Sequence, residues 1–159
     1  MPPWLMIAGF VAGGVIRGVL VGLLVLLISL FFTGLAVSIH SLLIILAFAI
    51  FTSVLFSLAG LINGVYAKSI DAINIVPTFV LQPLTYLGGI FYSVHSLPQA
   101  AQYVTYINPL FYLINGFRYG FLGFADVSIW LCVGVLLGLI VVLIGINLYL
   151  IRTGLGLKQ

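Results

Sequence analysis

Charged side chains are nearly absent from this sequence. Only five lysine and arginine residues and two acidic residues occur among 159, and charged types make up 4% of the chain. A soluble domain carries about 25% charged residues, so this chain cannot cover a surface that faces water. Apolar types make up 64%, and the mean hydropathy is +1.41. The composition predicts a protein whose solvent is the lipid bilayer.

The residues that most catalytic sites need are also scarce. Glutamate is missing, and the two aspartates, Asp71 and Asp126, lie far apart in the sequence. Paired carboxylates for acid–base catalysis or for a proton relay are therefore not expected. A single cysteine, Cys132, excludes an intrachain disulfide, two histidines without nearby carboxylates make a poor metal site, and the run 62–69 lacks the glycines of a phosphate-binding loop. We expect a non-catalytic chain that binds no cofactor itself.

Four apolar runs are long enough to cross a bilayer, which takes roughly 20 mostly apolar residues. Hydropathy and the positions of the charges place the predicted spans at about 17–37, 41–65, 73–93 and 127–150. The predicted fold class is therefore an all-α membrane protein with four transmembrane helices, in a single membrane domain over residues 1–159.

The segment 96–124, between the third and fourth spans, is too apolar for an ordinary loop. Ten of the chain's 22 aromatic residues fall in positions 91–124, and aromatic rings suit the headgroup level of a membrane. Pro98 and the Asn108-Pro109 step divide the segment into pieces too short to cross. Irregular backbone at membrane depth must pack against protein or water, so we predict two short re-entrant helices on the outer side.

The basic residues sort to one face of a chain with four spans. Arg17, Lys68, Arg152 and Lys158 share that face, and only Arg118 lies on the other. Basic residues near span ends favour the cytoplasm, which predicts that both termini are cytoplasmic. The basic residues form no patch, so nucleic acid is not an expected partner.

Arg118 is the charge that most needs an explanation. A charged side chain at the bilayer centre costs about 2.5–3.5 kcal/mol on insertion scales, and the cost falls near the interface because a long side chain reaches water. Arg118 is either an interface anchor or a structural lock or substrate contact at an external gate. Asp126 lies close enough in sequence to pair with it.

The third predicted span is interrupted by proline and glycine. Pro83 has no N–H, so one backbone carbonyl loses its usual partner and the helix kinks or unwinds. Gln82 and Thr85 stand beside it, and Gly88-Gly89 adds a second soft point. Gln82, Pro83, Gly88 and Gly89 are therefore candidate hinge residues, with a packing kink as the alternative.

Small and polar residues recur within the spans. Pairs of glycines four positions apart, such as Gly14/Gly18 and Gly116/Gly120, predict close packing of helices. Three polar residues lie within or near the spans: Ser53, Asn63 and Asn147. They form hydrogen bonds between helices in one interpretation and line a pore in the other.

Two runs, "VPTFVLQPLTYLGGIFYSVHSLPQ" and "INPLFYLINGFRYGFLG", together carry a resemblance to a known family. They resemble the C-terminal signature region of type-2 ATP-binding-cassette (ABC) exporter permeases of the bacterial inner-membrane efflux kind. "GGVIRGVLVGLLVLLISLFF" (13–32) also resembles the family's run from a cytoplasmic coupling segment into its third span. The family's permease normally has six spans, and the four predicted here resemble spans three to six.

The resemblance implies partners and candidate sites. Two permeases form the pathway as a homodimer in the bilayer, and separate ABC ATPase subunits bind ATP and Mg²⁺ and drive it. Residues 2–16 would contact the ATPase, with Gly13, Gly14 and Arg17 as the candidate coupling region. The candidate outer gate, in the re-entrant element, consists of Asn108, Pro109 and Arg118.

The expected function is that of a permease subunit in the bacterial inner membrane, part of an ATP-driven exporter. A mostly apolar pathway favours lipophilic or amphipathic cargo: a drug, a lipid or a glycolipid. The alternatives are a structural or assembly protein of the membrane that transports nothing, and an inactive truncated permease. A secondary carrier has little support because so few charges lie within the spans.

Overall fold

The computed structural model describes residues 2–33, 38–67 and 69–153. The last part of the first predicted span, 34–37, lies outside the described residues, as do Lys68 and Lys158. Every regular element in the described ranges is a helix, which confirms an all-α chain.

Three helices are long and apolar enough to cross a membrane: α1 (Pro3–Thr33), α2 (Ile39–Tyr66) and α7 (Ile129–Thr153). Each coincides with a long uncharged or nearly uncharged run, which an isolated helix can bury only in lipid or against other helices. Their outer faces expose large apolar side chains, among them Phe31 at 85% and Trp130 at 81%. Such faces are suited to contact with lipid tails.

The first helix differs from its predicted bounds. It begins at Pro3, whose ring fits the first turn of a helix, and runs without a break past Arg17 to Thr33. The segment 2–16, expected to precede the span, is therefore largely the first half of the same helix. Arg17 suggested a boundary in the sequence, but the flanking residues are apolar on both sides and continue the helix.

The third predicted span is helical but broken into three parts. α3 (Ile70–Ile75), the π-helical segment η1 (Val76–Leu81) and α4 (Gln82–Leu87) follow one another directly. The helix ends at Leu87, before the predicted end of the span at 93, because Gly89 adopts a positive φ of 83°. Whether this segment crosses the membrane stays a prediction.

Two short helices, α5 (Gln99–Ile107) and α6 (Pro109–Leu122), occupy the ring-rich segment and meet at Asn108. A short 3₁₀ turn, η2 (Val94–Ser96), precedes them. The division at Asn108-Pro109 agrees with the prediction, and re-entry into the bilayer remains a prediction.

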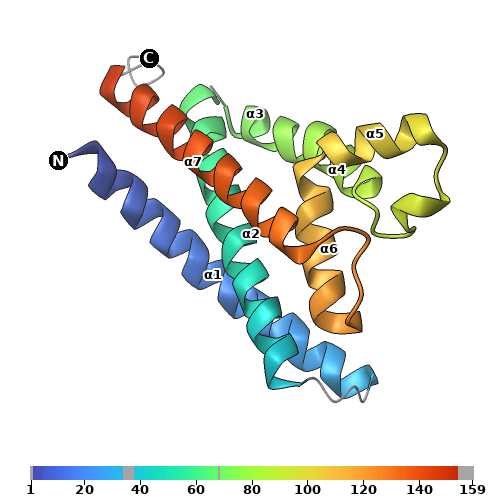
Figure 1. Cartoon of the computed structure of the whole chain (residues 1–159). Helices are drawn as coiled ribbons and strands as arrows, with labels where there is room; N and C mark the ends of the chain where they lie inside the picture. The colour runs from blue at the N-terminus through green and yellow to red at the C-terminus, as the bar shows by residue number, and fades with distance from the viewer. Residues whose placement is uncertain (1, 34–37, 68, 154–159) are drawn as a thin grey trace.

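The core lies where α6 packs against both α2 and α7 (Figure 1). Gly116 and Gly120 of α6 face Phe48 and Ile45 of α2, with no room for a larger side chain at either glycine. Small residues at these positions let the two backbones approach closely. The predicted packing role of this glycine pair is confirmed.

A second set of small residues joins α1 to α2. Gly14 of α1 lies directly against Ser57 of α2, and Gly18 lies against Ser53. The two helices are therefore antiparallel. Two of the three polar positions also link elements: Asn147 Nδ2 donates to Leu58 O at 3.1 Å, and Asn63 Nδ2 donates to Ile73 O at 2.8 Å. Ser53 differs, because its hydroxyl donates to Ala49 O within its own helix at 2.7 Å.

The start of α1 and the end of α7 lie at the same end of the molecule (Figure 1). One small cavity there is lined by Met6 and Phe10 from α1, Leu61 and Val65 from α2, and Leu150 and Ile151 from α7. α2 finishes at this same end of the molecule, and α7 begins toward the opposite end. The segment between α2 and α7 therefore connects the two ends.

Candidate functional site

Arg118, on α6, is bound on three sides. Its Nη1 donates to Asp126 Oδ2 at 2.7 Å, and its Nη2 donates to the carbonyls of Gly89 and Tyr92, the latter at 3.2 Å. The side chains of Arg118 and Asp126 are 13% and 6% exposed. The guanidinium therefore ties α6 to the turn after α4 and to the loop before α7. The pairing with Asp126 that the sequence suggested is present.

Asp126 is held by several donors. Ser93 Oγ donates to its Oδ1 at 2.7 Å, and the backbone N–H of Val94 donates to its Oδ2 at 3.2 Å. Burial alone would raise the pKa of this carboxyl, but these two hydrogen bonds and the Arg118 guanidinium bring its pKa below the ordinary value of 3.8. The carboxylate is therefore the charged centre of a polar cluster. We call it the outer cap cluster because the topology prediction puts it on the outer side, and it consists of Gly89, Tyr92, Ser93, Val94, Arg118 and Asp126.

Asn115 completes the attachment of this cluster and was not singled out in the sequence. It is 1% exposed. Its Oδ1 accepts from Asp126 N at 2.8 Å, and its Nδ2 donates to Val127 O at 3.1 Å and to Cys132 Sγ at 3.2 Å. The sequence did offer a sign of its role: Asn115 is an amide one helical turn before Arg118, so the two side chains share a face of α6.

Asn108 and Pro109 fix the start of α6. Asn108 Oδ1 accepts from Leu110 N at 3.0 Å as an N-cap, with Pro109 as the first helical residue. Asn108 Nδ2 also donates to Leu84 O at 2.6 Å, which links the joint between α5 and α6 to α4. The three candidate gate residues therefore lie on one helix, but only Arg118 belongs to the outer cap cluster.

The candidate hinge residues lie at the change of helix type. The N–H of Gln82 bonds to Pro77 O, five residues back, so the π turn ends where Gln82 begins the next helical segment, with Pro83 in its first turn. Thr85 Oγ1 donates to Leu81 O at 2.7 Å. Gly88 packs tightly against Ile114, and Gly89 uses its positive φ to present its carbonyl to Arg118. Gly89 thus joins the hinge region to the outer cap cluster.

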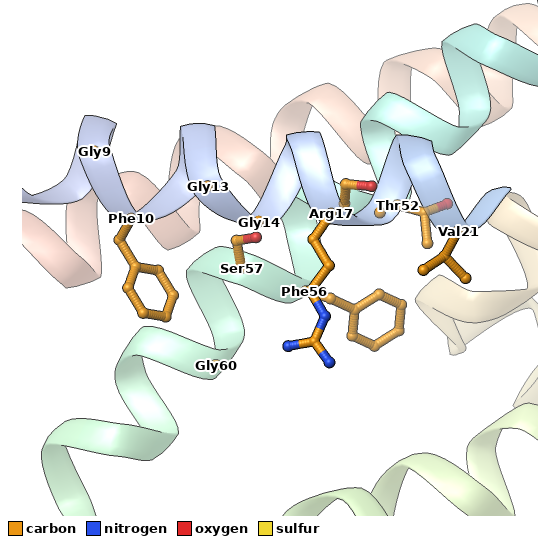
Figure 2. Close-up of a pocket in the computed structure, with 12 residues that line it drawn as sticks. Gly9, Phe10, Gly13, Gly14, Arg17, Val21, Thr52, Phe56, Ser57 and Gly60 are labelled. Carbon is orange, nitrogen blue, oxygen red and sulfur yellow. The ribbon is translucent and has the colours of Figure 1, made fainter. Parts of the chain in front are cut away.

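The candidate coupling residues line a groove between α1 and α2 (Figure 2). The two helices diverge toward Gly9 and Gly60, and the Arg17 side chain extends away from α1 past Phe56. The groove has a volume of about 840 Å³. Gly13 and Gly14 border it, although Gly14 also packs against Ser57.

Comparison with known proteins places these features in a family. The family model described as ABC-2 type transporter matches residues 1–122. The chain is 51% identical over 159 residues to the inner membrane transport permease YadH of Escherichia coli K12, covering all of this chain and 61% of that protein. Proteins of the same name from Escherichia coli O157:H7 and Shigella flexneri match to the same extent. No solved structure matches.

The chain thus spans about three fifths of the length of these curated relatives. The family model covers the first two long helices, the broken helical segment, and the helix that carries Arg118. The all-α architecture with three long apolar helices agrees with a membrane transport protein. The chain is therefore a member of the ABC-2 type transporter family of membrane permeases.

Proposed function

We propose that the chain is the membrane-spanning permease subunit of an ATP-driven ABC exporter that moves lipophilic or amphipathic cargo across the cytoplasmic membrane of a bacterium. The observation that carries the proposal is the 51% identity, across the whole chain, to a protein named as an inner membrane transport permease. The largely apolar surfaces of α1, α2 and α7 favour cargo that partitions into lipid. A drug, a lipid and a glycolipid all meet this description.

ATP and Mg²⁺ are bound by a partner ATPase in this proposal, and two permease chains form the pathway. The candidate coupling residues Gly13, Gly14 and Arg17 lie midway along the α1–α2 pair, which does not favour direct contact with a water-soluble ATPase. The end of the molecule where α1 begins and α7 finishes is better placed for that contact (Figure 1). Cysteine cross-linking from Pro2, compared with Gly13, distinguishes the two positions.

The outer cap cluster is the proposed external gate. Opening that side requires the Arg118 contacts to Asp126, Gly89 and Tyr92 to break together, since all three converge on one guanidinium. Motion in the hinge region reaches the cluster through Gly89. Arg118→Ala, with folded yield measured beside export, tests the assignment: lower or uncoupled export at unchanged yield supports a gate, and unchanged export at unchanged yield contradicts it.

The experiment that tests the whole proposal is affinity purification of the tagged chain from its native membrane, followed by reconstitution in vesicles. We expect an ABC ATPase to co-purify and its hydrolysis of ATP to rise when an amphipathic cargo is present. An assembly protein or an inactive permease would bring down no ATPase that responds to cargo. A dependence on an ion gradient in place of ATP would indicate a secondary carrier.

A further inference from the structure

Arg17 occupies an unusual position within the molecule. It lies next to Gly18, which contacts Ser53, and Ser53 lies midway between the ends of α2, Ile39 and Tyr66. At 1.5 Å per residue, each end of α2 is about 20 Å away. The charge therefore lies near the middle of two antiparallel membrane helices, where an isolated arginine is costly.

This cation has no partner within the described residues. The ion pair that the described ranges contain joins Arg118 to Asp126, and Arg17 takes part in no hydrogen bond there. None of the residues that line its groove is acidic. Arg17 is exposed and is one of the residues that line the groove (Figure 2). Ionisable residues inside a membrane usually face a cavity and pair with an opposite charge, and this chain does not provide one at that site.

A second, apolar cavity adjoins the groove. That cavity, of about 350 Å³, shares Gly18, Val21, Thr52 and Ser53 with the groove as lining residues and extends along α1 to Val25 and Leu26. Phe117 and Phe121 of α6 also line it. The groove thus presents a cation at Arg17, and the neighbouring cavity is apolar.

The hydroxyl groups beside Arg17 contribute little to binding an anion. Thr52 Oγ1 already donates to Phe48 O at 2.6 Å, and Ser53 Oγ donates to Ala49 O at 2.7 Å. Arg17 is therefore the strong donor that faces this part of the groove. A guanidinium binds the oxygens of a phosphate or a carboxylate through two parallel hydrogen bonds.

We propose that the groove between α1 and α2 binds an amphiphile with an anionic headgroup, with the headgroup at Arg17 and the apolar tail in the cavity lined by Phe117 and Phe121. The inference rests on the proposed function and narrows its cargo to acidic amphiphiles. Charge complementarity favours this occupant over a second copy packed through the same groove, because such a copy would bring a second cation and no acid.

Lipid quenching of a tryptophan in the groove tests the proposal. Phe10 borders the groove, so Phe10→Trp, combined with Trp4→Phe and Trp130→Phe, gives a single reporter in the whole 159-residue chain. The chain is reconstituted in vesicles of phosphatidylcholine that contain either brominated phosphatidylglycerol or brominated phosphatidylcholine. We expect quenching by the anionic lipid at about tenfold lower mole fraction, the gain of one charge-assisted contact.

Two variants separate the charge from the space. Arg17→Gln should abolish the preference for the anionic lipid, and Arg17→Lys should keep most of it. Gly13→Leu should reduce quenching by both lipids, because Gly13 borders the groove and has open space around it, so the new side chain fills the groove without a clash. This second variant tests the proposal even if Arg17→Gln does not fold.

Matched controls exist elsewhere in the chain. Arg152→Gln removes the same charge at the end of α7, and Gly134→Leu adds the same side chain at another open glycine. Both should leave the preference unchanged. Soluble glycerol 1-phosphate should not displace the lipid, because it lacks the tail.

Several results would overturn the proposal. Equal quenching by the two lipids, or a preference that survives Arg17→Gln, would mean that Arg17 does not bind the headgroup. Full displacement by glycerol 1-phosphate would mean that the site takes an anion without a tail, and no quenching by either lipid would mean that protein covers the groove. The assay uses no ATP, so a failure of ATP-driven export would refute the proposed function and leave this result standing.

Discussion

At the scale of single residues, the ion pair between Arg118 and Asp126 makes a prediction about stability. Asp126→Asn leaves a half-buried guanidinium without its counter-charge, and the cost should fall between the roughly 0–1 kcal/mol of an exposed pair and the about 3–5 kcal/mol of a fully buried one. We expect the free energy of unfolding in detergent to fall by that order, measured by helical circular dichroism during a denaturant titration. Asp71→Asn removes an exposed carboxylate on α3 and should change the free energy little. Equal losses in the two variants would contradict the role of the pair.

The lowered pKa of Asp126 also predicts the direction of a pH effect. Its pKa in the folded chain lies below the ordinary value of 3.8, so the unfolded chain binds the proton more readily. The carboxylate stabilises the fold fully at pH values above 3.8, and this contribution is lost as the pH falls through the folded pKa. Unfolding titrations that continue from pH 6 to well below pH 3.8 should show this loss in the parent chain and not in Asp126→Asn.

Some contacts of single residues could be predicted from the sequence and others could not. Arg118 and Asp126 stood out because charges are so rare, and their proximity in sequence allowed the pairing to be predicted. The carbonyls of Gly89 and Tyr92 were not foreseen as acceptors, because a backbone contact far away in sequence leaves no mark on residue type. Asn115 escaped notice for a related reason, since one amide in an apolar helix is common and its partners become visible only once α7 is placed.

At the scale of helices, the glycines of α6 predict a packing effect. A methyl group at position 116 would meet the Phe48 ring, which is 2% exposed and has no room to move. Forcing an extra methyl group into such a contact costs about 1–3 kcal/mol. Gly116→Ala should lower the midpoint of thermal unfolding in detergent. Gly134→Ala on α7, where the added carbon meets nothing within 4 Å, should leave it unchanged or higher.

The broken helical segment supplies a second prediction at this scale. Pro83→Ala restores a backbone N–H at the junction of η1 and α4, which allows a straighter α-helix. If the junction is a hinge, export by the complete transporter should fall several-fold while folded yield stays unchanged. Pro98→Ala, at the start of α5, serves as the control. Unchanged export in Pro83→Ala would identify the interruption as a packing kink.

The helices also show where prediction from sequence stops. The bounds of α2 and α7 follow the apolar runs closely, because nothing in those runs competes with a helix. The span was predicted to begin at Arg17, but the helix already begins at Pro3 because the residues before Arg17 continue it; where the membrane begins along α1 stays a prediction. A proline in the third span predicted an interruption, but not its form as a π turn, because a missing N–H is compatible with a kink, a π turn or local unwinding.

For the whole molecule, the number of bilayer crossings decides on which side each terminus lies. Three helices are long enough by themselves, and three crossings would put the termini on opposite sides. The structure instead brings Trp4 and Leu148 into one cavity, at the end of the molecule where α2 finishes. A return crossing must then lie between α2 and α7, and the segment from Ile70 to Val94 is the one predicted to make it. Its helical part alone spans about 27 Å at 1.5 Å per residue, close to the hydrocarbon thickness.

Four crossings predict a distinct pattern of accessibility. Single cysteines at Pro2, Ser69, Ser96 and Thr153, all exposed positions, can be labelled with a membrane-impermeant maleimide in intact cells, with Cys132 replaced by serine. We expect Cys at position 96 to react from outside, and those at 2, 69 and 153 to react only after the membrane is opened. Reaction of positions 69 and 96 from the same side would mean that α3, η1 and α4 do not cross. The outer cap cluster could not then face away from the end where the termini lie, and its assignment as an external gate would fail with the topology.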